Sequence, residues 1–308
     1  MARLTTTSSG LLAVLAAAAL FGTTGTAQAL GSSWAGVDLD PLAVGSIRVV
    51  LAALLLVPLA RLRGELGPTS RGGATRLLVG GVGVALYQVG FFTGVHSAGV
   101  AAGTMIALGS GPAFTGALQW ALDRTRPRPI WFLSTGLAVA GMLLLVSGTD
   151  AGEGANITAG AVAALSAGFG YSLYTVAGSR SIAAGTRPDA AMAQMFAVGA
   201  VILLPVLLAR WPGGLDSAAG IGVALYLAAV PTVIAYLLFA IGLQSLPPAT
   251  VATLTLAEPV VAALLGIFVL GESPTLLSAT GMVVVAAALV LLSVDIRRQA
   301  HRSTVSDN

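Results

Sequence analysis

The chain of 308 residues contains no cysteine, no lysine and only two histidines, His96 and His301. Without cysteine there can be no disulfides, thiolate metal sites or cysteine nucleophiles. Without lysine there can be no Walker A phosphate-binding loop and no Schiff-base lysine. Two distant histidines do not build a histidine-rich metal site. We therefore expect neither a metal nor a cofactor.

Charge is also scarce. Only 9% of the residues are charged, 56% are hydrophobic, and the mean hydropathy is +0.92. A soluble domain carries about 25% charged residues, so this chain cannot cover a water-exposed surface of its size. The composition predicts an all-α membrane protein that crosses the lipid bilayer many times.

Ten stretches are long and apolar enough to cross a bilayer, which takes about 20 residues. Charged or Pro/Gly-rich breaks separate them, and the loops are too short to hold a soluble domain. The predicted spans are 10–30, 41–60, 76–96, 99–121, 130–148, 157–178, 190–209, 218–243, 249–270 and 275–294.

The arginines fall mostly on one side of this arrangement. With the N-terminus in the cytoplasm, thirteen of the 15 arginines lie inside, Arg210 lies outside and Arg48 lies within a span. A cytoplasmic excess of basic residues is the usual signal of orientation. We expect a multi-pass protein of the inner or plasma membrane with both termini cytoplasmic. The pI near 9.8 reflects this topology, so no nucleic-acid partner is expected.

The first span has a second interpretation. Arg3, the apolar run 11–21 and the small residues around Gln28 also resemble a secretory signal with its cleavage site. Cleavage would leave nine spans. The internal repeat described next needs the first helix and favours ten.

The two halves of the chain repeat each other. Each half is predicted to hold five spans, at 1–150 and at 151–308 with a short cytoplasmic tail. An odd number of spans inserts the second half upside down, and such inverted repeats are typical of secondary transporters with a site near the midplane. Three proline pairs are each 147 residues apart, and two aromatic positions also recur: Pro58/Pro205, Pro112/Pro259, Pro127/Pro274, Phe21/Phe169 and Tyr87/Tyr236.

Several motifs resemble those of the drug/metabolite transporter superfamily, specifically its EamA-type ten-helix members. Thr255-Leu-Ala-Glu258-Pro259, followed by Leu270-Gly271-Glu272, is similar to the family's Glu-Pro helix that ends in Gly-Glu. The span with Arg48 resembles the family's second helix, and Gly160 to Tyr174 resembles its sixth. The first repeat departs from the pattern, because Gly111-Pro112 stands where the second repeat has Glu258-Pro259.

Glu258 is the leading site candidate, because it lies about 15 Å along its span, close to the midplane. A carboxylate at that depth is unfavourable unless it is protonated, paired or facing water. Pro259 donates no backbone hydrogen bond and is expected to leave the carbonyl of Thr255 bare. We expect Glu258 to bind a substrate amine or a coupling proton. The alternative is a structural acid that caps a kink or pairs with an arginine.

Arg48 is the only basic residue at depth. It either snorkels to the interface, forms a structural pair or binds a substrate carboxylate with its planar fork. Arg48 and Glu258 together would suit a zwitterionic amino acid. Further candidates for substrate binding or coupling are Tyr87, Gln88, Gln28, Tyr171, Tyr174, Tyr236 and His96, each with a packing or interfacial role as its alternative.

Other residues are assigned structural roles. Pro58, Pro112, Pro205 and Pro259 are predicted helix kinks. Trp34, Trp120, Trp131 and Trp211 lie at span ends and are predicted interfacial anchors. The glycine pairs Gly90/Gly94 and Gly99/Gly103 are expected to pack helices within the chain.

The repeat and the resemblance together favour a secondary active transporter of small metabolites, such as amino acids, related amphipathic compounds or drugs, by alternating access. Export as the direction is implied by the resemblance alone. Expected partners are a small-molecule substrate, protons and the lipid bilayer, in a monomer or homodimer. The alternatives are an uptake carrier of the same fold and a non-transporting membrane scaffold or receptor. An intramembrane enzyme is disfavoured, because Glu258 is the only deep acid.

Overall fold

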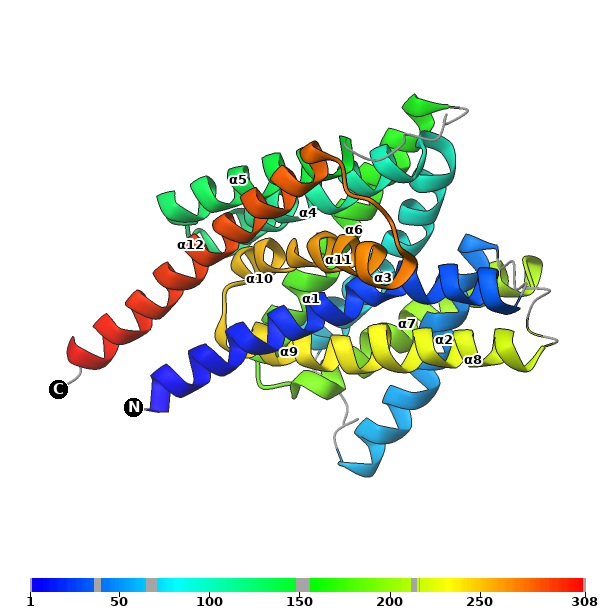
Figure 1. Cartoon of the computed structure of the whole chain (residues 1–308). Helices are drawn as coiled ribbons and strands as arrows, with labels where there is room; N and C mark the ends of the chain where they lie inside the picture. The colour runs from blue at the N-terminus through cyan, green and yellow to red at the C-terminus, as the bar shows by residue number, and fades with distance from the viewer. Residues whose placement is uncertain are drawn as a thin grey trace.

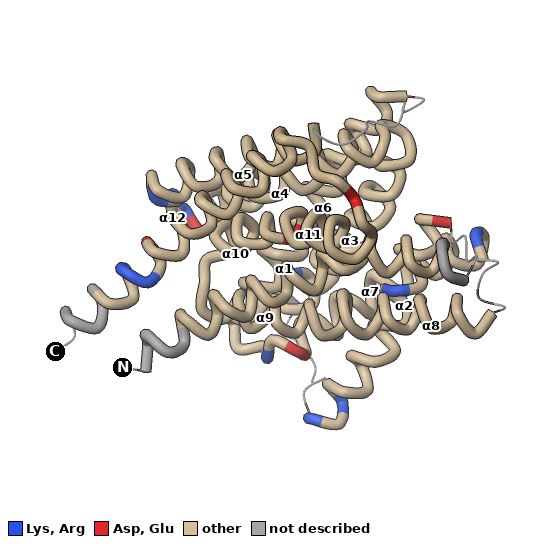
Figure 2. The backbone as a smooth tube through the Cα atoms, in the orientation of Figure 1, with Lys and Arg blue, Asp and Glu red and all other residues tan. Residues whose placement is uncertain are grey.

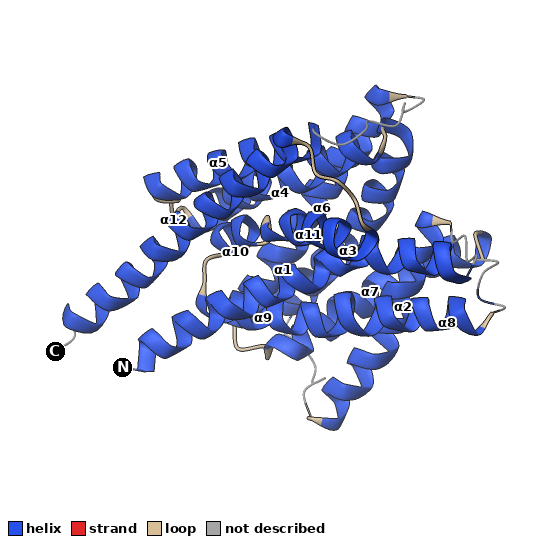
Figure 3. Ribbon diagram, in the orientation of Figure 1, coloured by secondary structure: helices blue, strands red, loops and turns tan. Residues whose placement is uncertain are grey.

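The computed structural model of the chain describes residues 2–35, 40–64, 71–147, 156–211, 215 and 217–306. These ranges are helical almost throughout and contain no strand (Figure 3). The helices are α1 (Ala2–Ala35), α2 (Pro41–Leu62), α3 (Arg71–Ala98), α4 (Val100–Asp123), α5 (Pro129–Ser147), α6 (Ile157–Ala183), α7 (Pro188–Ala209), α8 (Ala218–Ala228), the π-helix η2 (Ala229–Ile234), α9 (Ala235–Ser245), α10 (Pro248–Leu254), α11 (Ala257–Leu270) and α12 (Leu276–Ser306).

Each of the ten predicted spans coincides with one helix or with a chain of shorter ones. α8, η2 and α9 follow one another as a single span, and α10 and α11 make up another. Nine spans within the described residues are apolar and long enough to cross a membrane. The tenth, α4, is a helix of 24 residues that is not among these nine. The predicted all-α membrane fold is confirmed.

α1 begins and α12 ends at the same end of the bundle, at the lower left of Figure 1. We call this the terminal end, and α2, α4, α6 and α9 also end on this side. α1, α3, α5, α7 and α11 end on the opposite side, the distal end. Charged residues concentrate near the helix ends (Figure 2). The terminal end is the one predicted to face the cytoplasm.

The two halves of the chain pack through corresponding helices. α3 lies along α6, and α1 lies correspondingly along α8 and α9; α2 packs on α7, and α5 packs on α12. This pairing agrees with two inverted five-helix repeats. The boundary predicted at residues 150 and 151 lies outside the described residues.

Small residues allow the closest of these contacts. A Cβ atom on Gly90 would lie 2.7 Å from the carbonyl oxygen of Ala163, and one on Gly103 would lie 2.6 Å from backbone atoms of Val95. A larger residue at either position would force helices apart. The prediction that glycines pack helices within the chain is confirmed for Gly90, Gly94 and Gly103, whereas Gly99 lies between α3 and α4 with a φ of 88°.

The prolines act in two ways. Pro58, Pro112 and Pro205 lie inside helices that continue past them, and their role as kinks stays a prediction. Pro259 lies in the first turn of α11. Backbone N–H groups have no partner within the helix there, so the missing N–H of proline removes no helical hydrogen bond. The Glu258 amide donates to the carbonyl of Thr255 at 2.9 Å. The expectation of a bare Thr255 carbonyl is therefore wrong.

An unpredicted π-helix interrupts the eighth span. Pro231 has no N–H to donate to the carbonyl of Leu227, four residues earlier, and the hydroxyl of Thr232 donates to that carbonyl instead, at 2.7 Å. Single turns of π-helix often mark functional sites. This turn ends directly before the helix that carries Tyr236.

The tryptophans do not share one role. Trp120 and Trp211 are about half exposed, as expected of interfacial residues, and the side chain of Trp34 lies outside the described residues. Trp131 is buried, and its indole N–H donates to the carbonyl of Ala249. Its prediction as an interfacial anchor is wrong, because a helix end that is next to the membrane surface can still face another helix.

Candidate functional site

A cavity of about 710 Å³ reaches from the distal end toward the middle of the bundle. Its walls come from α1, α4, α5, α11 and α12 and are mostly apolar, with scattered hydroxyl groups. Among the described residues, two carboxylates line it, Glu258 at the start of α11 and Glu272 just beyond the end of that helix, and no arginine does. We call it the distal cavity.

Glu258 lies deep in this cavity. It is twelve residues before Leu270 at the distal end of α11, or about 18 Å along a helix. Its carboxylate makes no hydrogen bond or ion pair with the described part of the chain. Gly22 allows α1 to approach, because a Cβ atom there would lie 2.8 Å from the Glu258 carbonyl oxygen. The sequence thus folds an unpaired acid against a cavity wall made by α1.

The four predicted tyrosines meet in the centre of the bundle. Tyr171 and Tyr174 of α6 have ring centroids 5.1 Å apart, and Tyr87 of α3 lies 6.2 Å from both. Tyr236 of α9 donates its hydroxyl to that of Tyr174 at 3.2 Å. The hydroxyl of Tyr171 lies 2.8 Å from that of Thr255, at the break between α10 and α11. This central cluster therefore joins both repeats next to Glu258.

Arg48 of α2 is held beside the cluster by Gln88, the residue after Tyr87. Only 8% of Arg48 is exposed, so the snorkelling interpretation is wrong. Its guanidinium donates to the Gln88 side chain at 3.3 Å, and the Gln88 amide donates to the Gly45 carbonyl at 2.8 Å. Its Nε has no partner in the described part of the chain. This is a structural pair with a spare donor.

Arg48 and Glu258 make no ion pair with each other, but both adjoin the cluster. Arg48 bonds Gln88, the residue after Tyr87, and Glu258 follows the α10–α11 break at which Thr255 contacts Tyr171. The predicted cation and anion are thus both neighbours of one aromatic cluster. Arg48 is not part of the distal cavity wall, so the structure brings the two charges near each other without placing both in that cavity.

Two predicted residues lie away from this centre. His96 is exposed near the distal end of α3. Gln28 is partly buried, and the distal cavity is lined instead by its neighbours Gly25, Thr26 and Ala29. Their roles stay predictions.

Sequence analysis missed several polar contacts between helices. Thr255 bonds Tyr171, Gln119 of α4 accepts from the Ala249 amide at 3.0 Å, and the hydroxyls of Thr135 and Thr253 are 2.8 Å apart. Gln119 and Trp131 were the available signals, because an amide and an indole N–H inside apolar spans need partners.

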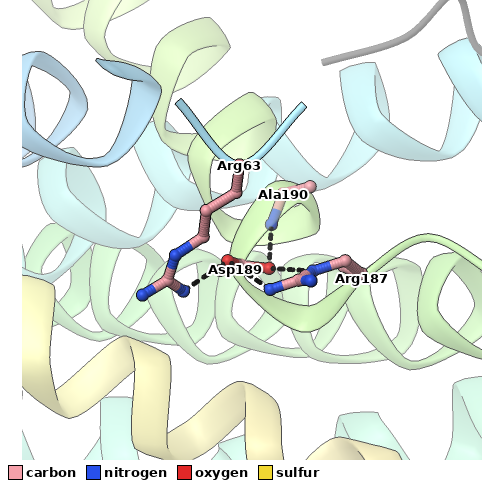
Figure 4. A network of polar contacts seen from close by, with 4 residues as sticks. All are labelled: Arg63, Arg187, Asp189 and Ala190. Carbon is pink, nitrogen blue, oxygen red and sulfur yellow. Dashed lines mark hydrogen bonds and ion pairs between the residues drawn. The ribbon is translucent and has the colours of Figure 1, made fainter. Parts of the chain in front are cut away.

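Ion pairs tie the repeats together at the terminal end. Asp189, at the start of α7, accepts from Arg63 at 2.8 Å, from Arg187 at 3.2 Å and from the Ala190 amide at 3.1 Å (Figure 4). Arg63 belongs to the first repeat and Asp189 to the second. The arginine-rich end is thus held by cross-repeat charges as well as by packing.

Ten membrane helices around a deep cavity with an unpaired acid define a multi-pass membrane protein that can bind a small molecule. The model of the EamA-like transporter family matches residues 8–147 and again 158–294. The chain therefore belongs to this family, as the motifs predicted, and the family is one of transporters rather than enzymes. The first match includes the first helix.

Three relatives show how the chain compares. It is 38% identical over 291 residues to the uncharacterized transporter YwfM of Bacillus subtilis, covering 94% of this chain and 95% of YwfM. It is 27% identical over 300 residues to the uncharacterized inner membrane transporter YicL of Salmonella typhimurium, covering 96% and 98%. It is 33% identical over 187 residues to the threonine/homoserine exporter RhtA of Salmonella typhimurium, covering 60% and 62%.

A solved crystal structure has the same fold. It superposes with a TM-score of 0.78 at 19% identity and covers 95% of this chain and 99% of its own. At this identity the likeness supports the fold alone.

Proposed function

We propose that the protein exports a small amphipathic metabolite that carries an amine, an amino acid or a related compound, and that Glu258 binds this amine or a coupling proton. The unpaired Glu258 carboxylate in a cavity without basic lining residues carries the proposal. A carboxylate with apolar walls attracts a cation more strongly than one in water. The apolar walls suit the aliphatic part of such a ligand.

The relatives support the substrate class and the direction. RhtA bears the name of a threonine/homoserine exporter, and its match covers 60% of this chain. Amino acids are zwitterions, and a cation, Arg48, adjoins the same central cluster as Glu258. No observation favours uptake.

The proposed mechanism is alternating access. The distal cavity is open, and the terminal end is closed by packing and ion pairs. With both termini in the cytoplasm, as the arginines predict, this state opens to the outside and would release a substrate that is being exported. Rocking of the two repeats would then expose Glu258 to the cytoplasm. Proton coupling and the monomeric or dimeric state remain predictions.

A resistance screen tests the proposal. Cells that overproduce the protein are grown on inhibitory amounts of amino acids, their analogues and drugs, beside cells that produce Glu258→Gln at the same level in the membrane. We expect resistance to one class and its loss in the variant. Equal resistance with Glu258→Gln at every external pH would contradict the role of Glu258.

Counterflow in liposomes separates the function classes. Purified protein is expected to exchange labelled threonine or homoserine, or the class found in the screen, without chemical change. Failure to exchange any of them would favour the scaffold or receptor alternative.

A further inference from the structure

This inference rests on the proposed alternating access and concerns how the terminal end of the pathway is held closed. Helix α10 fills the bundle on the terminal side of the α10–α11 break. It is buried along most of its length and packs against α4, α5 and α6. Leu246 and Pro247 are extended before it, and Thr255 and Leu256 form a turn after it. α10 is a seven-residue segment with a joint at each end.

Two side chains of the first repeat hold one residue of α10. The amide of Ala249 donates to Oε1 of Gln119 on α4, and the carbonyl of Ala249 accepts from Nε1 of Trp131 on α5, each at 3.0 Å. The amide of Ala249 belongs to the first turn of α10, where N–H groups have no partner within the helix. We call Gln119, Trp131 and Ala249 the latch.

The latch is held in place by its surroundings. Gly116 makes room for the indole, since a Cβ atom there would lie 2.5 Å from the Trp131 ring. One turn beyond Ala249, Thr253 contacts Thr135 of α5, with their hydroxyls 2.8 Å apart. The same face of α10 is thus bonded to the first repeat at two levels.

A second cavity of about 610 Å³ adjoins the latch at the terminal end, and all three latch residues line it. We call it the terminal cavity. α10 and its latch therefore lie between this cavity and the distal cavity that reaches Glu258. If the latch breaks, its polar groups face the terminal cavity, where water can bond them, so release leaves no buried donor or acceptor unpaired.

We propose that the latch is the gate of this transporter at the terminal end. When both hydrogen bonds break, α10 pivots at its two joints, and the path from Glu258 opens into the terminal cavity. When they re-form, the protein returns to the state open at the distal end.

The cysteine-free chain allows a direct test, because a single introduced cysteine is the only thiol. Val251→Cys reports on α10, where Val251 is fully buried, and Ala262→Cys reports on the distal cavity. Each reporter is combined with Trp131→Phe or Gln119→Leu, and thiol labelling rates are measured in lipid nanodiscs. We expect faster labelling of Val251→Cys, by about fivefold for each hydrogen bond removed, and slower labelling of Ala262→Cys.

Matched variants make the result specific. Trp120→Phe removes an exposed indole N–H from the residue next to Gln119. It should leave the labelling rates of Val251→Cys and Ala262→Cys unchanged. Thr135→Val removes the second contact of α10 and should act in the same direction as the latch variants. Unchanged labelling of Val251→Cys in all three latch-side variants, each monodisperse in gel filtration, would overturn the proposal. No substrate enters this experiment, so its result is separate from that of the resistance screen.

Discussion

The two ends of the bundle are held in different ways. The distal end has a cavity that reaches Glu258, and one ion pair between described residues joins the repeats there, Arg210 with Asp40 at 2.9 Å. At the terminal end the latch and three ion pairs between described residues join the repeats: Arg63 with Asp189, Arg128 with Asp295, and Arg180 with Asp123.

Under the proposed alternating access, this difference would let one sequence have two access states. The terminal end is closed by polar contacts whose partners reach water when they separate, and partly exposed ion pairs are each worth about 1 kcal/mol or less. Such contacts close the pathway without making closure irreversible. The following predictions test the contrast from its largest expected effect to its smallest.

Overpacking the contact between α5 and α12 should have the largest effect. A Cβ atom on Gly141 of α5 would lie 2.7 Å from the Val285 amide nitrogen of α12, and backbone cannot move aside as a side chain can. Gly141→Leu should lower the free energy of unfolding by about 3 kcal/mol, seen as a lower melting midpoint in intrinsic fluorescence. Gly136→Leu, on the same helix with open space around it, is the control. Equal midpoints would show that α5 and α12 are not tightly packed there.

Breaking the most buried ion pair of the terminal end should come next. Asp189 is 7% exposed and is bonded by two arginines. Asp189→Asn should lower the free energy of unfolding by about 2 kcal/mol, because it removes the ion pairs of Asp189 with Arg63 and with Arg187. It should also speed labelling of Val251→Cys, as the latch variants do. Asp295→Asn removes a more exposed ion pair and should lower the free energy of unfolding by less than Asp189→Asn does. An equal or larger loss would contradict this ranking.

The single cross-repeat pair described at the distal end should matter least. Burial opposes the charged form of Asp40, but the Ala43 amide and the Arg210 guanidinium outweigh it, so the pKa of Asp40 lies below its ordinary 3.8. Because the pKa of Asp40 is lowered in the folded state, its carboxylate stabilises the fold at pH values above the ordinary pKa. This stabilisation is lost as the pH falls through the folded-state pKa. Asp40→Asn should therefore cost a few tenths of a kcal/mol, constant from about pH 5 to 8.

Melting midpoints at several pH values check this last prediction. The difference between the wild type and Asp40→Asn should shrink below about pH 4. Asp40→Ala should cost about 1 kcal/mol, because it also removes the cap that Asp40 provides to α2 through the Ala43 amide. A difference that grows on acidification would contradict the sign of the pKa shift.

The parts of the fold that could be predicted are those that depend on local sequence. Span positions follow from runs of apolar residues, and the family follows from motifs such as Glu258-Pro259. The spacing of Tyr171 and Tyr174, three residues apart on a helix, puts them on one face, and their rings do meet. The broken ninth span was predicted as a single kinked helix, because a proline shows where a helix is weak but not whether it ends.

The predictions that failed concern which neighbour a side chain meets. Trp131 was assigned to the interface because it begins a span, yet it bonds Ala249, 118 residues later. Arg48 was allowed to snorkel, yet it bonds Gln88 on the next helix.

The scarcity of charge and the absence of cysteine and lysine determined from sequence alone that this is a membrane protein without thiol or lysine chemistry. The arginines and the five-span repeat added its expected orientation and its likeness to transporters. Only the tertiary structure decided that Glu258 is left unpaired beside a cavity, that Arg48 is buried and bonded to Gln88 beside the tyrosine cluster, and that α10 is latched by the first repeat. The reason is physical: periodicity shows which residues share one face of a helix, but the helix that covers this face is selected by packing across the whole bundle.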